Sequence, residues 1–261
     1  MDIPSRSSGA LLASAAMLLL SFTPVHAVNA SESNPWSVDG ALYFWYASVG
    51  GRTSAETGVD IDASDLVGNL DYAFMGNLDA RKDKWSFMVD MIYLDIGADK
   101  QTTASIPGDP GVSAAINANV DLAGWVTTLT GAYNVLETDR NRVDILAGAR
   151  YLWLKTDLDI GLGAPLPPAT LSTSESGSVL DAIIGIKGRL GLSDKWFLPY
   201  YLDIGAGESK STWQAFGGIG YQFSKVDAVL AYRHLEWEYD DRPVFNDLNF
   251  DGPFAGVKFR F

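Results

Sequence analysis

The sequence of 261 residues contains no cysteine and only two histidines. Without cysteine the chain cannot form a disulfide or a thiolate-metal site, so its fold depends on hydrogen bonding and packing. Positive charge is also scarce, because 19 Lys and Arg residues stand against 32 Asp and Glu, giving a net charge of −13. This balance argues against nucleic acid as a partner, since its phosphates would be repelled. Beyond the amino-terminal region, no apolar run approaches the roughly 20 residues that a transmembrane helix needs.

The amino-terminal region has the pattern of a signal peptide. One arginine precedes an apolar run over residues 9–22, which is too short to span a bilayer comfortably as a helix. Small residues would allow cleavage after Ala27 or after Ala30. A buried amino-terminal helix is the alternative, but polar residues follow the run without a helix cap. The sequence therefore predicts an exported protein, with a signal peptide over residues 1–27 and a single domain over residues 28–261.

The rest of the sequence is a regular alternation of apolar and polar residues. In residues 179–192 the even-numbered positions are mostly apolar, whereas Asp181, Lys187 and Arg189 are odd-numbered. A period of two is typical of a β-strand and collects charges on one face, while a helical period would scatter them around the axis. Ten such segments are predicted as strands: 36–49, 69–80, 85–96, 120–135, 143–156, 179–192, 196–206, 212–223, 226–239 and 252–261.

The connections between these segments alternate in length. Four of them are short and polar, at residues 81–84, 136–142, 193–195 and 224–225. Four others are long, at residues 50–68, 97–119, 157–178 and 240–251. The link at residues 207–211 is short, although it falls among the long ones. Short turns on one rim and long loops on the other are typical of outer-membrane barrels.

Together these patterns predict an all-β fold, a transmembrane antiparallel up-and-down β-barrel of about ten strands, with eight or twelve as alternatives. Strands of the expected lengths, tilted by about 35–45°, would cover an apolar band about 25 Å tall. Aromatic residues make up 12% of the chain, which suits girdles at two membrane interfaces. A soluble β-sandwich also alternates, but it has no reason for the unequal connections or for aromatic residues at strand ends.

The carboxyl-terminal segment carries a resemblance to a known class of proteins. Phe261, Phe259, Val257 and Ala255 form one apolar face, opposite Arg260 and Lys258. This pattern resembles the last strand of bacterial outer-membrane barrels, and strings such as Tyr-Arg in 231–235 are similar to those of OmpA-like and OmpW-like barrels. The resemblance implies an outer-membrane location, contact with membrane lipids and lipopolysaccharide, a monomeric state, and Phe259 and Phe261 as a signal for the barrel-assembly machinery. It implies no activity, and the chain has more strands than the eight typical of those families.

The inward faces of the predicted strands carry many charges. Buried charges need partners or water, so we expect either a network of ion pairs that fills the lumen or a narrow charged pore. Barrels of about eight strands are just filled by side chains, so ten strands favour the network. The residues concerned are Asp90, Asp144, Arg150, Asp181, Lys187, Arg189, Asp203, Asp227, Arg233, Lys258 and Arg260.

Acidic residues also gather in the predicted loops, and two explanations are open. Carboxylates could hold Ca²⁺ or Mg²⁺, but no calcium-loop spacing is present, so we expect a solvated acidic surface and no metal or other cofactor. The residues are Asp60, Asp62 and Asp65 in the first loop, and Glu236, Glu238, Asp240, Asp241, Asp247 and Asp251 around the last.

Enzymatic activity has little support in the sequence. His26 belongs to the signal peptide, which leaves His234 as a catalytic histidine, with Glu236 or Asp240 as its carboxylate. The parity of the strand places His234 on the lipid-facing side, and no hydrolase, zinc or phosphate-loop motif is present. We therefore expect a structural or interaction role that presents acidic loops, rather than an enzyme. A narrow solute or ion channel is the alternative, and a hydrolase using His234 is third.

Overall fold

The computed structural model describes residues 35–53, 58–105, 113–162, 169–240 and 245–261. The predicted signal peptide and both possible cleavage sites lie outside these residues. Within the described part of the chain, no helix has the length and apolar character needed to span a bilayer.

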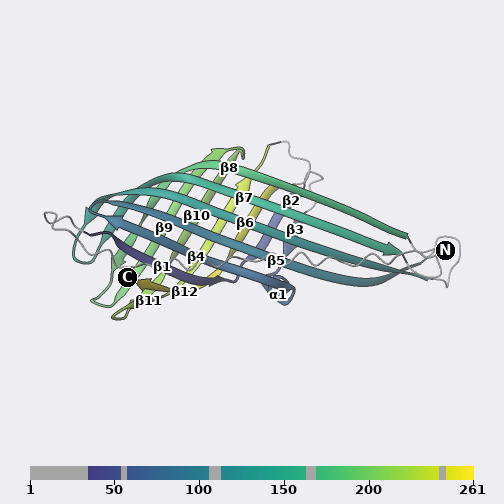
Figure 1. Ribbon diagram of the computed structural model, residues 1–261, viewed down its shortest axis with the longest axis horizontal. Coiled ribbons are helices and arrows are strands. Elements are labelled where there is room, and N and C mark those ends of the chain that lie inside the picture. The colour runs from purple at the N-terminus through teal and green to yellow at the C-terminus, as the bar shows by residue number, and fades with distance from the viewer. Residues whose placement is uncertain (1–34, 54–57, 106–112, 163–168, 241–244) are drawn as a thin grey trace, which may run out of the picture. The chain divides into compact units, whose positions relative to one another are not determined.

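Ten strands form the wall of a closed antiparallel β-barrel (Figure 1). Each wall strand pairs with the next one, and β12 returns to pair with β1, from Asp39 opposite Arg260 to Trp45 opposite Phe254. The prediction of a ten-stranded up-and-down barrel is therefore confirmed. The wall strands are β1 (Ser37–Trp45), β4 (Leu70–Lys82), β5 (Trp85–Ser105), β6 (Ser113–Glu137), β7 (Arg142–Leu162), β8 (Ala169–Gly191), β9 (Trp196–Gly207), β10 (Ser211–Gln222), β11 (Val226–Glu238) and β12 (Phe245–Arg260).

The two ends of the barrel differ, and we call them the turn end and the long-strand end. Tight turns join β4 to β5, β6 to β7, β8 to β9 and β10 to β11 at the turn end. In the first of these turns Asp83 has a φ of 54°, a left-handed conformation that aspartate tolerates better than most residues.

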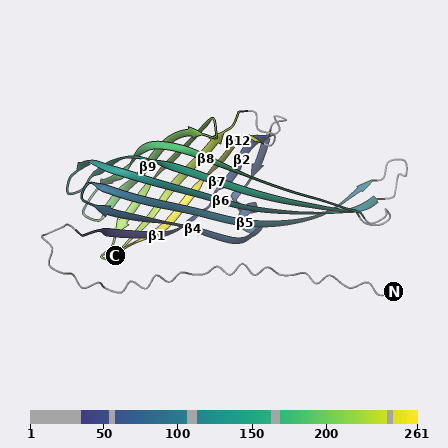
Figure 2. The same ribbon diagram turned by 45° about the horizontal axis from the view of Figure 1, so that its top comes forward.

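The strands β5 to β8 are longer than the sequence predicted. They continue as a four-stranded sheet past the last pairs that join them to their neighbours, Leu70 with Ile96 on one side and Asp181 with Gly207 on the other (Figures 1 and 2). The interpretation of 97–119 and 157–178 as loops was therefore wrong for much of their length. The prediction ended each strand where apolar alternation ends, but backbone pairing continues through residues rich in Ser, Thr, Asp and Asn.

The predicted strand 36–49 is interrupted. It forms β1 and β2 (Ser48–Thr53), and the following residues form β3 (Gly58–Ile61) and α1 (Ala63–Gly68) instead of a plain loop. The interruption faces Pro253 of β12, whose carbonyl oxygen accepts a 2.9 Å hydrogen bond from the Tyr46 N–H. Because proline has no N–H to donate in return, the ladder cannot be continuous at this point.

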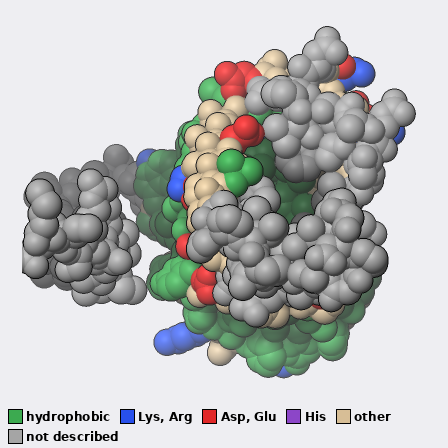
Figure 3. All heavy atoms as spheres, turned by 90° about the vertical axis from the view of Figure 1, so that its right-hand side faces the viewer, with side chains coloured by type: hydrophobic (Ala, Val, Ile, Leu, Met, Phe, Trp, Pro, Cys, Tyr) green, Lys and Arg blue, Asp and Glu red, His purple; other side chains and the backbone are tan. Residues whose placement is uncertain are grey.

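The outer surface of the barrel is apolar. Large hydrophobic side chains such as Leu42, Phe74, Ile184 and Leu230 are exposed there, in strands whose alternate positions face inward. Hydrophobic side chains cover the flank of the barrel in the space-filling view (Figure 3). Soluble proteins rarely expose apolar surface on this scale, whereas a barrel in a membrane must.

Aromatic residues gather near both edges of this apolar band. At the turn end, Trp85 packs on Tyr133 with ring centroids 5.0 Å apart, and Trp196 packs on Tyr221 at 4.9 Å. Towards the long-strand end, Tyr93 and Trp125 form another pair, as expected for the second of two interfacial girdles.

Candidate functional site

The lumen of the barrel has two parts of opposite character. The part nearer the turn end is filled by charged and polar side chains, and the part nearer the long-strand end is an apolar cavity. The polar part contains most of the inward charges that the sequence indicated, so its pairing is described first.

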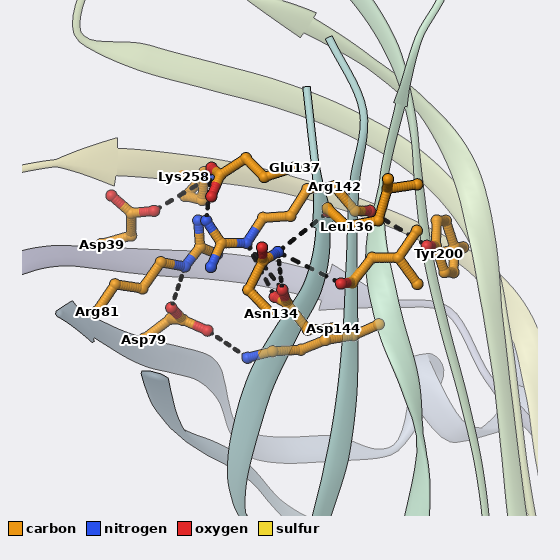
Figure 4. A network of polar contacts seen from close by, with 12 residues as sticks. Asp39, Asp79, Arg81, Asn134, Leu136, Glu137, Arg142, Asp144, Tyr200 and Lys258 are labelled. Atoms are coloured by element: carbon orange, nitrogen blue, oxygen red, sulfur yellow. Dashed lines mark hydrogen bonds and ion pairs between the residues drawn. The ribbon is translucent and has the colours of Figure 1, made fainter. Parts of the chain in front are cut away.

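Lysine, arginine and aspartate from distant strands meet at the turn end (Figure 4). Asp79 is buried and lies 2.6 Å from Lys187 Nζ and 2.9 Å from Arg81 Nε. Arg142 pairs with Asp144 at 3.0 Å, and the Asp144 carboxylate also accepts a hydrogen bond from the side-chain amide of Asn134. These contacts fix β4 to β8 across the lumen and anchor the start of β7.

A second group of ion pairs joins the two ends of the chain at the same level. Asp227 is fully buried and lies 3.0 Å from Arg260 and 3.5 Å from Lys258, and Lys258 also contacts Asp39 at 3.2 Å. The adjacent Arg189 donates to Gln222 at 3.1 Å, and its guanidinium group lies 4.2 Å from the ring centre of Phe197.

Two buried arginines occupy the middle of the lumen. Arg150 is fully buried, pairs with Asp203, and donates to Thr212 at 3.1 Å. The cost of removing such a guanidinium from water is large, and these contacts offset it.

The second of these arginines, Arg233, sits in a cluster with three partners. It donates to Asp90 and to Gln214 at 2.8 Å each, and to the Tyr43 hydroxyl oxygen at 3.1 Å. The Tyr43 hydroxyl in turn donates to Asp90 at 2.7 Å. Four strands, β1, β5, β10 and β11, contribute to this cluster.

Asp181 has a different environment from the other charges. It is the backbone partner of Arg150 across β7 and β8, yet Arg150 pairs with Asp203 instead. The Asp181 carboxylate accepts a 2.9 Å hydrogen bond from the backbone N–H of Ser209, in the turn between β9 and β10. Its position in the register therefore did not identify its partner.

Two tryptophans cover the arginines on the side of the long-strand end. The Arg233 guanidinium lies 4.9 Å from the ring centre of Trp45, and that of Arg150 lies 5.9 Å from the ring centre of Trp237. Cation–π contact of this kind is favourable, so each tryptophan ring takes the place of water beside its guanidinium group. We call these four residues the floor; of the four, Trp45 lines the cavity above them.

Above the floor lies an apolar cavity of about 590 Å³. It receives inward-facing side chains from most of the wall strands, and Glu175 is the only charged residue among the described residues that line it. A volume of roughly 300–1,000 Å³ with mostly apolar walls is typical of sites for small molecules. Representative lining residues are Ile92, Leu94, Val126, Leu154, Val179 and Leu235.

The rim above the cavity is polar. Thr156 of β7 and Thr173 and Glu175 of β8 line the cavity there. On the outward face of β7, the Lys155 ammonium group lies 2.5 Å from the Asp157 carboxylate. Hydrogen bonds from Lys155 and from Ser174 hold the pKa of Asp157 below its ordinary value. The outer surface beside the rim therefore carries an ion pair, while the inward residues Leu152 and Leu154 of the same strand are apolar.

The histidine that the sequence offered for catalysis lies outside the lumen. His234 shares the outward face of β11 with Leu230 and Tyr232, and its ring stacks on Trp213 at 4.3 Å. Its Nε2 atom lies 3.2 Å from the Glu236 carboxylate, which also accepts a 2.9 Å hydrogen bond from the Trp213 indole N–H. The arrangement is one of interfacial packing on the outer surface.

The predicted acidic loops are only partly described. Asp62, the N-cap of α1, and Asp65, in its first turn, are exposed. Asp240 is exposed, and Asp247 pairs with Arg52 at 2.6 Å. Nothing is described of the Asp60 side chain or of Asp241. Within the described ranges, no group of three or more acidic or histidine side chains is placed to hold a metal ion.

The two terminal phenylalanines lie on the outward face of β12. Phe259 and Phe261 are exposed, and the Phe261 N–H donates to the Val38 carbonyl oxygen at 3.0 Å, which continues the seam between β12 and β1. Their side chains are therefore accessible from outside the barrel.

The closed barrel, the apolar band and the unequal ends settle the class of fold. It is that of an outer-membrane β-barrel. No protein-family model matches the sequence, and no curated protein is similar to it. At 10–15% identity, the solved structures below share only a general likeness with the barrel.

Three of these solved structures show the range of identity and TM-score. The translocator domain of autotransporter NalP from Neisseria meningitidis is 15% identical, with 89% of this chain and 90% of that chain covered and a TM-score of 0.46. Ail, the attachment invasion locus protein of Yersinia pestis, is 10% identical, with 87% and 99% covered and a TM-score of 0.37. The CymD monoaromatic hydrocarbon channel is 10% identical, with 88% and 89% covered and a TM-score of 0.36. None of them identifies a binding residue in this barrel.

Proposed function

We propose that this protein is an integral barrel of the bacterial outer membrane that binds a small, uncharged, apolar molecule in its lumen. The observation that carries the proposal is the apolar cavity of about 590 Å³ above the floor. In an outer-membrane orientation the turn end faces the periplasm and the cavity opens outward. We further propose that the barrel acts as a monomer, with membrane lipids and lipopolysaccharide around its apolar band.

The absence of a counter-charge supports an uncharged ligand. Glu175 is the only charged residue among the described lining residues, and it lies towards the polar rim. A carboxylate or phosphate buried beside Leu94 and Leu154 would lose its hydration without gaining a cation. A neutral hydrocarbon would instead replace water on apolar surfaces, which is favourable in proportion to the area covered.

We expect Gly177→Phe to weaken this binding. Gly177 lines the cavity, and a Cβ atom added there has no neighbour within 4 Å, so the new ring enters open space rather than displacing the wall. Because the ring occupies ligand volume, affinity for a neutral fluorescent probe, N-phenyl-1-naphthylamine, should fall about tenfold or more, a change of about 1.4 kcal/mol. The measurement is fluorescence titration of the full chain in nanodiscs.

Gly217→Phe provides the matched control. Gly217 also has open space around an added Cβ, but it is exposed on the outward face of β10 and does not line the cavity. Both variants replace a strand glycine by the same residue, so any general effect of strand propensity is shared. Equal affinity of the two variants and the wild type would refute binding in this cavity.

A role in interaction, which the sequence favoured, is a second candidate. The sheet formed by the outer parts of β5 to β8 supports it, because one edge of β5 and one edge of β8 have no strand partner there in the described residues. Such edges can pair with an added strand. Shortening the β5–β6 hairpin should then reduce cell adhesion while probe binding stays unchanged. Adhesion that survives the deletion would remove this candidate.

A further inference from the structure

The backbone ladder around the cavity is not continuous, because the seam between β1 and β4 is incomplete. The two strands pair from Ser37 opposite Arg81 to Leu42 opposite Gly76. Beyond that pair, no ladder contact joins them in the described part of the chain. There the Trp45 N–H donates to the Met75 sulfur at 3.3 Å, in place of a backbone acceptor.

The strands on either side of the seam diverge above this point. The upper part of β4 pairs only with β5, and β2 pairs with β12 on one edge and with β3 on the other. The short helix α1 follows β3, with Leu66 buried and Val67 exposed. We call the gap bounded by β1, β2, α1 and upper β4 the split.

The cavity reaches this split. Its lining includes Leu66 and Val67 of α1, Leu70 of β4, and Phe44 of β1. Phe44 lies on the outward face of β1 and is 45% exposed. Leu42 and Tyr46 are exposed on the same face. Val67 is exposed as well, so residues that line this side of the cavity also reach the outer surface.

The split lies within the membrane rather than above it. Gly76 is six residues from Lys82, which pairs with Trp85 at the turn. At a rise of about 3.3 Å per residue and a tilt of about 35–45°, the last pair of the seam is therefore roughly 15 Å above the turn end. An apolar band about 25 Å tall would place the split in the half of the membrane nearer the long-strand end.

We propose that the split is a lateral entrance, through which an uncharged hydrocarbon dissolved in the outer leaflet passes between β1 and β4 into the cavity. This inference rests on the proposed binding function and adds the source and route of the ligand. The side chains along the route, from Phe44 past Val67 and Leu70 to Leu94, are all apolar. A molecule on this route never has to cross the polar rim or enter water.

The test uses a hydrocarbon that cannot leave the bilayer. A diacylglycerol with a photoreactive diazirine at the end of one acyl chain is neutral and stays in the membrane. After irradiation of the full chain in vesicles, peptide mass spectrometry should find adducts on the inward-facing Leu94 and Leu154 as well as on outward-facing residues. Adducts confined to outward-facing residues would overturn the lateral route.

Cysteine staples show whether the split is the path, because the chain has no cysteine of its own. Phe44→Cys with Phe74→Cys, bridged by a bis-maleimide, closes the seam just above its last pair and should abolish the inward adducts. Val38→Cys with Ala80→Cys joins residues already paired below the split and should leave these adducts unchanged. Inward adducts that persist in the first staple would also overturn the proposal.

A separate titration distinguishes failure of the route from failure of the binding function. N-phenyl-1-naphthylamine added from water reports on the cavity by whichever path it enters. If it binds and is weakened by Gly177→Phe while diacylglycerol gives no inward adducts, the cavity binds ligand but the split is not the entrance. If dodecanoate displaces N-phenyl-1-naphthylamine from the cavity as well as naphthalene does, the ligand is not restricted to uncharged molecules. If neither probe reaches the cavity, both proposals fail.

Discussion

Replacing Arg150 by alanine is expected to lower the free energy of unfolding by about 3–5 kcal/mol, since one partner of a buried ion pair is lost. Asp203 would be left buried, and Thr212 would lose a hydrogen-bond donor. Such a loss is severe for domains whose whole stability is about 5–15 kcal/mol. Equilibrium unfolding in urea, with the barrel in lipid vesicles and followed by tryptophan fluorescence, measures the change.

Arg140→Ala is the control for this experiment. Arg140 pairs with Asp194 at 3.0 Å, but both side chains are largely exposed at the turn end. Exposed ion pairs contribute about 0–1 kcal/mol, so this variant should unfold almost as the wild type does. If Arg150→Ala matched Arg140→Ala, the buried pair in the middle of the lumen would not stabilise the barrel.

In planar bilayers the wild-type barrel is expected to give no conductance steps. Arg150, Arg233 and their partners fill the middle of the lumen, and further ion pairs fill it at the turn end. Barrels of about eight strands have interiors that side chains just fill, and ten strands add little space. Insertion of the protein must be confirmed independently, by antibody or by a fluorescent label.

The double variant Arg150→Ala with Arg233→Ala should give no steps either, because the ion pairs at the turn end remain. It removes both guanidinium groups of the floor and leaves Asp90 and Asp203 without their ion-pair partners, so water can enter from the cavity but cannot pass the turn end. Steps from this variant alone would show that the floor, and not the turn end, closes the lumen. Well-resolved steps from the wild type would refute a filled lumen and support the channel that the sequence left open.

The architecture could be predicted from the sequence because a barrel wall repeats one simple rule. Alternate positions face lipid and lumen, so residues such as Ile184 and Lys187 indicate both a strand and its orientation. The short connections consist mostly of polar residues, unlike the long ones. The strands on either side of each short connection could therefore be predicted to be neighbours. Strand ends were less predictable, because the apolar pattern reports the thickness of the membrane rather than the extent of backbone pairing.

Pairing across the lumen could not be predicted by the same rule. Register identifies neighbours along the wall, such as Arg150 and Asp181, but Arg150 pairs with Asp203, two strands away. Asp39 and Asp79, which pair with Lys258 and Lys187, were not among the predicted lumen charges. Opposite walls approach each other only in the closed barrel, and no local pattern records that distance.

The cavity did leave a signal in the sequence. In residues 91–94 and 151–154 the alternation of polarity stops, and both faces of the strand become apolar. One face must meet lipid, so the other must line an apolar interior. The prediction considered the charged residues on the inward faces and not the apolar residues beside them, so it missed the cavity.

The seam between β1 and β12 has a consequence for how the barrel forms. Tyr43 and Gly256 are backbone partners although 213 residues of chain separate them. Every other wall pair joins strands that follow one another along the wall, but this one joins the first wall strand to the last. Contacts of such long sequence separation slow folding, because chain entropy is lost before the contact is gained. The cylinder should therefore close late and in a single slow step, and mutations in this seam should change the rate of closure more than those elsewhere in the wall.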